Sequence, residues 1–101
     1  MFKHIVLWKL KETANGKSRQ ENARLMKERF EEIANMLDGL QQLEVGINVL
    51  HGGDEAADVA LYMEFESRGA YEAYAVHPAH KALVTFIREV RTERRVIDYE
   101  V

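Results

Sequence analysis

Four stretches of this sequence carry apolar side chains at about every second position, and they limit the fold more than any other feature. The four stretches are residues 2–11, 43–49, 59–65 and 95–101. Alternate side chains share one face of a strand, so each stretch predicts a β-strand. In the first stretch, Val6 and Trp8 fall on one face. Ile5 and Leu7 fall on the other, so a sheet that contains this strand is apolar on both faces.

Between the first two strands, apolar side chains repeat with the period of a helix. Ser18 followed by Glu21 has the spacing of a capping box, which opens a helix, and Gly39 is a suitable end. The apolar side chains between them are Ala23, Met26, Phe30, Ile33, Ala34 and Leu37. Residues 12–17, which include an Asn-Gly pair, predict a turn before this helix.

The only proline divides a second helical region. Ser67 can cap a short helix that carries Tyr71 and Tyr74. That helix ends or kinks at His77, because the residue before a proline avoids the α conformation. Pro78 suits the first turn of a new helix, where its missing N–H costs nothing. The apolar side chains of the new helix are Ala82, Leu83, Phe86, Ile87 and Val90.

The elements follow the order β-α-β-β-α-β in a single domain over residues 1–101. This is the order of a ferredoxin-like α+β unit with a four-stranded antiparallel sheet. Residues 51–54 connect the middle strands and read His-Gly-Gly-Asp. That tetrapeptide matches neither the dinucleotide-binding fingerprint nor the P-loop, so it predicts a plain loop.

Composition and charge exclude several classes of function. The chain has no cysteine, which excludes disulfides, zinc–thiolate sites and thiol catalysis. The net charge is only −3, and Glu89 and Glu93 dilute the one arginine cluster, so we expect no nucleic-acid partner. That cluster consists of Arg88, Arg91, Arg94 and Arg95. No apolar run approaches the roughly 20 residues of a membrane span, and no signal peptide precedes the first strand. We therefore expect no membrane partner and a cytoplasmic location.

Two helices can cover only one face of a four-stranded sheet. The other face would expose an apolar patch, which monomers rarely leave in water. Its members are Ile5, Leu7, Ala60 and Tyr62. Packing two sheets face to face buries this patch, so we expect a twofold homodimer. A monomer with an amphipathic second face is the alternative.

Four segments resemble segments of one known family. Phe2–Lys11 looks like an opening strand, and residues 43–49 look like a second strand. Tyr71–His80, which ends His-Pro-Ala-His, is similar to a hallmark segment, and residues 96–101 fit the end. The family is the stress-responsive dimeric α/β-barrel (Dabb) domain, and the resemblance covers nearly the whole chain. It implies a ferredoxin-like subunit that pairs across a twofold axis into a dimeric α/β barrel.

The resemblance implies less about chemistry. The family includes plant stress proteins with no established reaction, uncharacterised bacterial proteins and a plant polyketide cyclase. In the cyclase, a histidine and a tyrosine of the hallmark segment act on a linear polyketide. Those positions correspond to His80 and Tyr74 here, and a histidine of the cyclase's first strand corresponds to His4. The resemblance therefore implies His80, Tyr74 and His4 as candidate catalytic residues.

These three side chains suit the chemistry of a carbonyl compound. His80 lies one turn into its helix, where the helix dipole favours the neutral imidazole that a general base needs. Tyr74 can donate a hydrogen bond to a carbonyl or enolate oxygen. Each residue also has a structural alternative, as a hydrogen-bonded core histidine or a tyrosine at the core edge. We expect the rings of His4 and His80 to approach each other or to share a pocket with Tyr74.

A mostly apolar pocket with few polar groups is the usual form of a small-molecule site. We expect such a pocket between sheet and helices, holding a small apolar or aromatic carbonyl ligand. The candidate ligand-binding residues are Phe2, Val6, Trp8, Tyr71, His77 and Phe86. His77 has an alternative role as the cap of the helix at Pro78. Because the residue before a proline is not helical, the spacing of His77 and His80 does not favour a metal site, and we expect no metal or cofactor.

Several functions remain open at this point. The first is a small-molecule binding protein, with or without polyketide-cyclase-like catalysis. The second is a non-catalytic structural or stress-related homodimer, which a cavity too small for a six-membered ring would favour. The third is a cofactor-free monooxygenase-like enzyme, which the fold permits but no residue requires.

Overall fold

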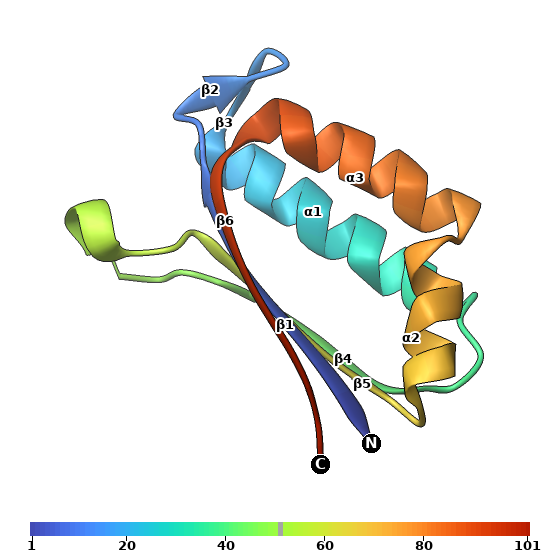
Figure 1. Ribbon diagram of the computed structural model, residues 1–101. Helices are drawn as coiled ribbons and strands as arrows, with labels where there is room; N and C mark the ends of the chain where they lie inside the picture. The colour runs from blue at the N-terminus through green and yellow to red at the C-terminus, as the bar shows by residue number, and fades with distance from the viewer. Residues whose placement is uncertain (51) are drawn as a thin grey trace.

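Four antiparallel strands form the main sheet of the computed structural model, which describes residues 1–50 and 52–101. In sheet order, the strands are β4 (Leu40–Ile47), β5 (Val59–Phe65), β1 (Phe2–Leu10) and β6 (Arg91–Glu100). One face of this sheet is covered by three helices (Figure 1), which are α1 (Arg19–Ala34), α2 (Arg68–Ala75) and α3 (Pro78–Val90). The predicted ferredoxin-like α+β fold is confirmed.

Strands β1 and β6 pair along their whole length, so the two ends of the chain lie together (Figure 1). Backbone hydrogen bonds join the first and last residues. The register places His4 opposite Asp98 and Trp8 opposite Arg94. It then shifts between Lys9 and Leu10. Residues opposite each other in a sheet share a face. Asp98 and Arg94 of the last strand therefore lie on the same face as His4 and Trp8 of the first strand.

The helices begin where their sequence signals predict. The Ser18 hydroxyl accepts a hydrogen bond from the Glu21 N–H, and the Glu21 carboxylate accepts one from the Ser18 N–H. This reciprocal pair is a capping box and starts α1. The Ser67 hydroxyl accepts from the Ala70 N–H at the start of α2, and Pro78 is the first residue of α3.

The segment before α1 is more ordered than a simple turn. It forms a small hairpin of β2 (Thr13–Ala14) and β3 (Lys17–Ser18). Asn15 and Gly16 connect the two strands with φ values of 54° and 73°. Two positive φ values are typical of the hairpin turn that Asn-Gly favours.

Three other boundaries differ from the predictions. Helix α1 ends at Ala34, before Leu37, and the chain then turns at Gly39 with φ +79°. A Cβ atom at Gly39 would lie 2.8 Å from the Ala70 Cβ, so the turn passes too close to α2 for a larger residue. Strand β4 covers 40–47 instead of 43–49 because its pairing with β5 begins directly after this turn.

Strand β6 starts at Arg91 and not at residue 95, because α3 passes directly into it without a loop. In the predicted loop at 51–54, His51 lies outside the described residues, and Gly53–Glu55 form a short 3₁₀ helix, η1.

The two faces of the sheet have different surroundings. The core lies between the sheet and the helices, and its largest fully buried side chains include Phe30, Phe65 and Tyr74. No helix among the described residues covers the opposite face (Figure 1), where Leu7 and Ile97 are exposed. None of the helices in the described part of the chain is long and apolar enough to cross a membrane.

Candidate functional site

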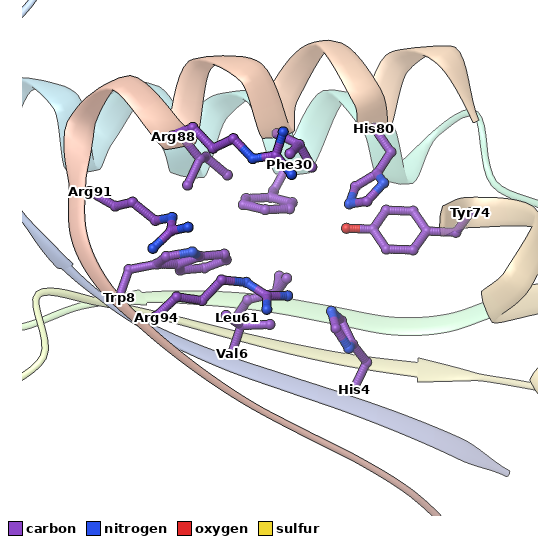
Figure 2. Close-up of a pocket in the computed structure, with 12 residues that line it drawn as sticks. His4, Val6, Trp8, Phe30, Leu61, Tyr74, His80, Arg88, Arg91 and Arg94 are labelled. Atoms are coloured by element: carbon purple, nitrogen blue, oxygen red, sulfur yellow. The ribbon is translucent and has the colours of Figure 1, made fainter. Parts of the chain in front are cut away.

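A cavity of about 270 Å³ lies between the helices and the sheet. Three alternate residues of β1 form one wall, because they share the face toward the helices: His4, Val6 and Trp8. The helices and the other strands supply the rest of the lining: Phe30, Leu61, Tyr74, His80, Val84, Ile87, Arg88, Arg91 and Arg94. Polar side chains thus lie at both ends of the cavity, and apolar side chains line the space between them (Figure 2).

His80 faces this cavity from the first turn of α3. Its Nδ1 lies 3.1 Å from the Ala75 carbonyl oxygen. A carbonyl only accepts, so Nδ1 carries the hydrogen, and Nε2 keeps an unshared electron pair. Burial lowers the pKa of His80 and outweighs the hydrogen bond to Ala75, which acts to raise it. His80 is therefore neutral at pH 7, with Nε2 as its basic atom.

The Tyr74 hydroxyl points into the same cavity (Figure 2). The side chain is only 1% exposed, and its ring centroid lies 4.2 Å from that of His80. Burial raises the pKa of Tyr74 far above its ordinary value, because the charged phenolate is disfavoured in an apolar environment. The hydroxyl therefore keeps its proton and can act as a hydrogen-bond donor.

His4 reaches the cavity from the opposite wall, and its ring centroid lies 6.3 Å from that of Tyr74. Its Nδ1 donates a hydrogen bond to the Asp98 carboxylate across the β1–β6 pair. Burial lowers the pKa of His4, whereas Asp98 opposes this shift. His4 is thus a buried neutral imidazole whose orientation is set by a carboxylate. The structure brings His4, Tyr74 and His80 to one cavity, as the sequence predicts, and their roles toward a ligand stay a prediction.

Asp98 was not predicted as a site residue. It lies on the last strand, and only the register of β6 against β1 places it opposite His4. A usable signal was present, because an antiparallel pairing of the first strand with the last brings His4 and Asp98 close to each other on one face.

Two of the six predicted ligand-binding residues line the cavity, namely Val6 and Trp8. Phe2 and Tyr71 lie beyond His4, where their rings stack on each other with centroids 4.6 Å apart. The Tyr71 ring also packs against His4, with centroids 5.0 Å apart, but Tyr71 is not part of the cavity lining.

His77 and Phe86 also lie outside the cavity lining. His77 is the N-cap of α3, and its Nδ1 accepts a hydrogen bond from the Ala79 N–H. This capping role is the structural alternative predicted for His77. Phe86 turns toward α1, where the Arg29 guanidinium lies 4.2 Å from its ring centroid.

Three arginines of the cavity lining were dismissed at the level of sequence, as members of a diluted cluster. In the structure, Arg88, Arg91 and Arg94 face the cavity. Glu93 points elsewhere and pairs with Lys9 at 3.6 Å. The Glu93 carboxylate therefore does not lie among the three arginines at the cavity, because neighbouring residues in a strand or helix point in different directions.

The arrangement can bind an apolar ring and act on a polar group attached to it. The walls supply aromatic and aliphatic contacts, and the two histidines and Tyr74 supply a base and hydrogen-bond donors. Within residues 1–50 and 52–101, no group of three or more histidine or carboxylate side chains is arranged to hold a metal ion.

Known proteins share this fold over almost the whole chain. The family described as the stress responsive A/B barrel domain matches residues 2–101. A dimeric protein of unknown function with a ferredoxin-like fold, from Bacteroides fragilis, is 32% identical with a TM-score of 0.80, and the match covers 99% of this chain and 95% of that one.

Two further solved structures have lower identity and show the fold alone. A dimeric ferredoxin-like protein of unknown function from Thermobifida fusca is 16% identical, with a TM-score of 0.82 and coverage of 99% and 90%. An Arabidopsis thaliana protein is 24% identical, with a TM-score of 0.77 and coverage of 100% and 95%. No curated protein matches the sequence.

Proposed function

The chain belongs to the stress responsive A/B barrel domain family, and we propose that it binds a small cyclic or aromatic carbonyl compound and moves a proton on it. One observation carries this proposal. The Tyr74 hydroxyl and the neutral His80 imidazole meet on a single cavity that is lined about equally by apolar and polar side chains. A proton donor and a base that share one cavity are the groups that enolisation of a carbonyl compound needs.

The size of the cavity supports a ring as the ligand. An engineered cavity of about 150 Å³ is large enough to bind benzene. The cavity here has a volume of about 270 Å³, which exceeds that requirement and favours a substituted single ring. This size argues against the alternative that the interior is too small for a six-membered ring.

The proposed step is a proton transfer at the carbon next to the carbonyl. Nε2 of His80 accepts the proton, so a C–H bond breaks and an N–H bond forms. The electron pair of the C–H bond forms a C=C bond, and the carbonyl electrons move to the oxygen. Tyr74 donates a hydrogen bond to that oxygen, and its raised pKa keeps the donor hydrogen in place. Return of the proton to carbon regenerates the neutral imidazole.

Deuterium exchange into acetophenone in D₂O, followed by NMR, tests this step without knowledge of the natural substrate. We expect the protein to accelerate exchange at the methyl group, and the acceleration to be lost in His80→Gln and reduced in Tyr74→Phe. His77→Asn is the matched control, because it removes an imidazole outside the cavity and keeps a capping side chain. Equal exchange with and without protein contradicts the proposed proton transfer.

A non-catalytic role is the second candidate, and the hydrogen bonds of the two histidines favour it. His4 joins β1 to β6 through Asp98, and His80 joins α3 to the end of α2 through the Ala75 carbonyl. If these bonds are the whole role of the histidines, His80→Gln lowers the free energy of unfolding and leaves acetophenone binding unchanged. Ligand-detected NMR and urea denaturation on the same variant separate the two functions.

We further propose that two subunits associate through the face of the sheet that carries no helix. Its exposed apolar side chains support this assembly, because an apolar surface of this kind marks an interface. The proteins from Bacteroides fragilis and Thermobifida fusca, which share the fold, are described as dimeric. The proposed result is a barrel in which the two sheets pack face to face.

A further inference from the structure

The cavity has a second polar end, which the proton-transfer proposal does not use. Arg88 and Arg91 stand at the end away from Tyr74, and Arg94 reaches between Trp8 and His4 (Figure 2). All three arginines line the cavity, although the last turn of α3 holds the first and β6 holds the other two.

A shift in strand register is what brings the arginines together. In a regular strand, Arg91 and Arg94 would point to opposite faces, because they are three residues apart. The pairing of β1 with β6 shifts so that Leu10 lies opposite Arg91 while Trp8 lies opposite Arg94. Leu10 and Trp8 both face the helices, so both arginines do as well. An extra residue of this kind commonly re-aims a side chain near a binding site.

None of these three arginines forms an ion pair within the described part of the protein. Among residues 1–50 and 52–101, the ion pairs involve other basic side chains. Arg88 and Arg94 are exposed and Arg91 is half-buried, so all three arginines line the cavity and also reach solvent.

A buried donor at the same end also lacks a partner. The Trp8 indole Nε1–H is completely buried and has no hydrogen-bond acceptor in the described part of the protein. A buried tryptophan N–H usually finds an acceptor, so its absence here needs an explanation. Trp8 lines the cavity and lies directly opposite Arg94 in the sheet. Three cations and one unpaired donor, without an acceptor, form an environment that an oxyanion completes.

We propose that Arg88, Arg91, Arg94 and the Trp8 indole N–H form a subsite for a carboxylate group on the ring compound. The ligand is then an aromatic or cyclic keto acid, with its ring in the cavity, its carboxylate at the arginines and its carbonyl at Tyr74 and His80. This proposal rests on the proposed function, because it assigns the charged group of the same ligand. Guanidinium groups bind carboxylates through paired hydrogen bonds, which gives orientation as well as affinity.

Titration of the intact protein with four probes tests the two ends of the cavity separately. Benzoate carries only the carboxylate, acetophenone only the carbonyl, 4-acetylbenzoate both, and benzamide is a neutral analogue of benzoate. The single tryptophan gives one indole N–H signal in a ¹H–¹⁵N NMR spectrum, which reports the arginine end directly. We expect benzoate and 4-acetylbenzoate to shift this signal, and 4-acetylbenzoate to bind roughly ten-fold or more tightly than acetophenone.

Substitutions provide a second, independent measurement. We expect Arg91→Gln and Arg94→Gln each to weaken 4-acetylbenzoate binding roughly ten-fold and to change acetophenone binding less than two-fold. Arg24→Gln is the matched control, since it removes one positive charge from an exposed position on α1 outside the cavity lining.

The outcomes separate this proposal from the proposed function. If benzoate binds no better than benzamide to the wild-type protein, the proposed carboxylate subsite is wrong. This comparison uses only the wild-type protein, so it does not depend on whether any variant folds. Tighter binding of phenyl phosphate than of benzoate overturns the assignment to a carboxylate. If benzoate binds and acetophenone does not, the arginine subsite stands and the proposed carbonyl chemistry fails.

Discussion

Along strand β1, the side chains that point toward the helices are buried, and those on the other face meet solvent. His4, Val6 and Trp8 are at most 4% exposed and line the cavity. On the opposite face, Leu7 is 42% exposed, and Ile97 of the neighbouring strand is 57% exposed. One strand with a period of two therefore supplies a wall of the candidate site and part of the proposed assembly surface. Because the two sets of side chains point in opposite directions, substitutions can change one face without the other.

The largest expected effect is on the buried face. We expect His80→Gln to slow deuterium exchange into acetophenone by about 10²–10⁴-fold, because it removes the proposed base. The apparent mass in light scattering should not change, since His80 is on the helix side of the sheet. A variant that loses exchange and also changes its mass would break the separation between the faces.

The next largest effect is expected on the exposed face. Leu7→Glu should raise the dimer dissociation constant by about 100-fold, because a dimer would then bury an unpaired carboxylate against apolar side chains. Sedimentation or light scattering at several concentrations measures this constant. Met36→Glu is the control, since Met36 is an exposed apolar side chain in the connection between α1 and β4 and is not part of a sheet strand. A wild-type protein that is monomeric at micromolar concentration contradicts the proposed dimer.

The stability of the protein should depend on pH through the two histidines of the buried face. Folding lowers the pKa values of His4 and His80 below their ordinary value of 6.5 through burial. Just below pH 6.5, the unfolded chain therefore binds more protons than the folded protein, and the free energy of unfolding falls as the pH decreases. The slope is at most about 1.4 kcal/mol per pH unit for each histidine.

Urea denaturation on both sides of pH 6.5 measures this dependence. The slope should become smaller in His80→Gln and in His4→Asn, because each variant removes one of the two titrating groups. The same dependence on pH should remain in Leu7→Glu when its dissociated subunits are compared with dissociated wild-type subunits. If the free energy of unfolding depends on pH equally in the wild type and in both histidine variants, His4 and His80 are not the source of that dependence.

The smallest effect concerns a residue that belongs to neither the site nor the assembly surface. Ser18→Ala should lower the free energy of unfolding by about 1 kcal/mol, because it removes the side-chain acceptor of the α1 capping box. Exchange rate and dimer dissociation constant should remain within two-fold of the wild-type values. Ser18→Asp, which keeps an acceptor, should restore most of the lost stability.

The sequence predicted the fold because the fold depends largely on local signals. The alternation of residues 2–11 and 59–65 identified two strands, and Ser18, Ser67 and Pro78 marked the starts of the three helices. Boundaries that depend on distant contacts were less accurate. Helix α1 and strand β4 were misplaced because the turn between them packs against α2 and β5, and no local pattern reports those neighbours.

The candidate site was predicted in part, and its remaining members depend on pairing across the sheet. His4, Tyr74 and His80 were named from the sequence and the resemblance, and they share the cavity. Asp98 was missed because its partner is 94 residues away along the chain. Arg94 was misjudged because its neighbours in sequence are not its neighbours in space.

The sequence by itself determined the order of elements, the helix starts, the polar residues of the hallmark segment and an apolar second face of the sheet. These features follow from the period of a strand or helix and from the chemistry of proline and serine, which act over a few residues. Only the tertiary structure decided the register in which the last strand pairs with the first. That pairing sets the orientation of His4 through Asp98, and its shift in register turns Arg91 and Arg94 toward one cavity. Register between distant strands is fixed by the packing of the whole sheet, so it is absent from any single stretch of the chain.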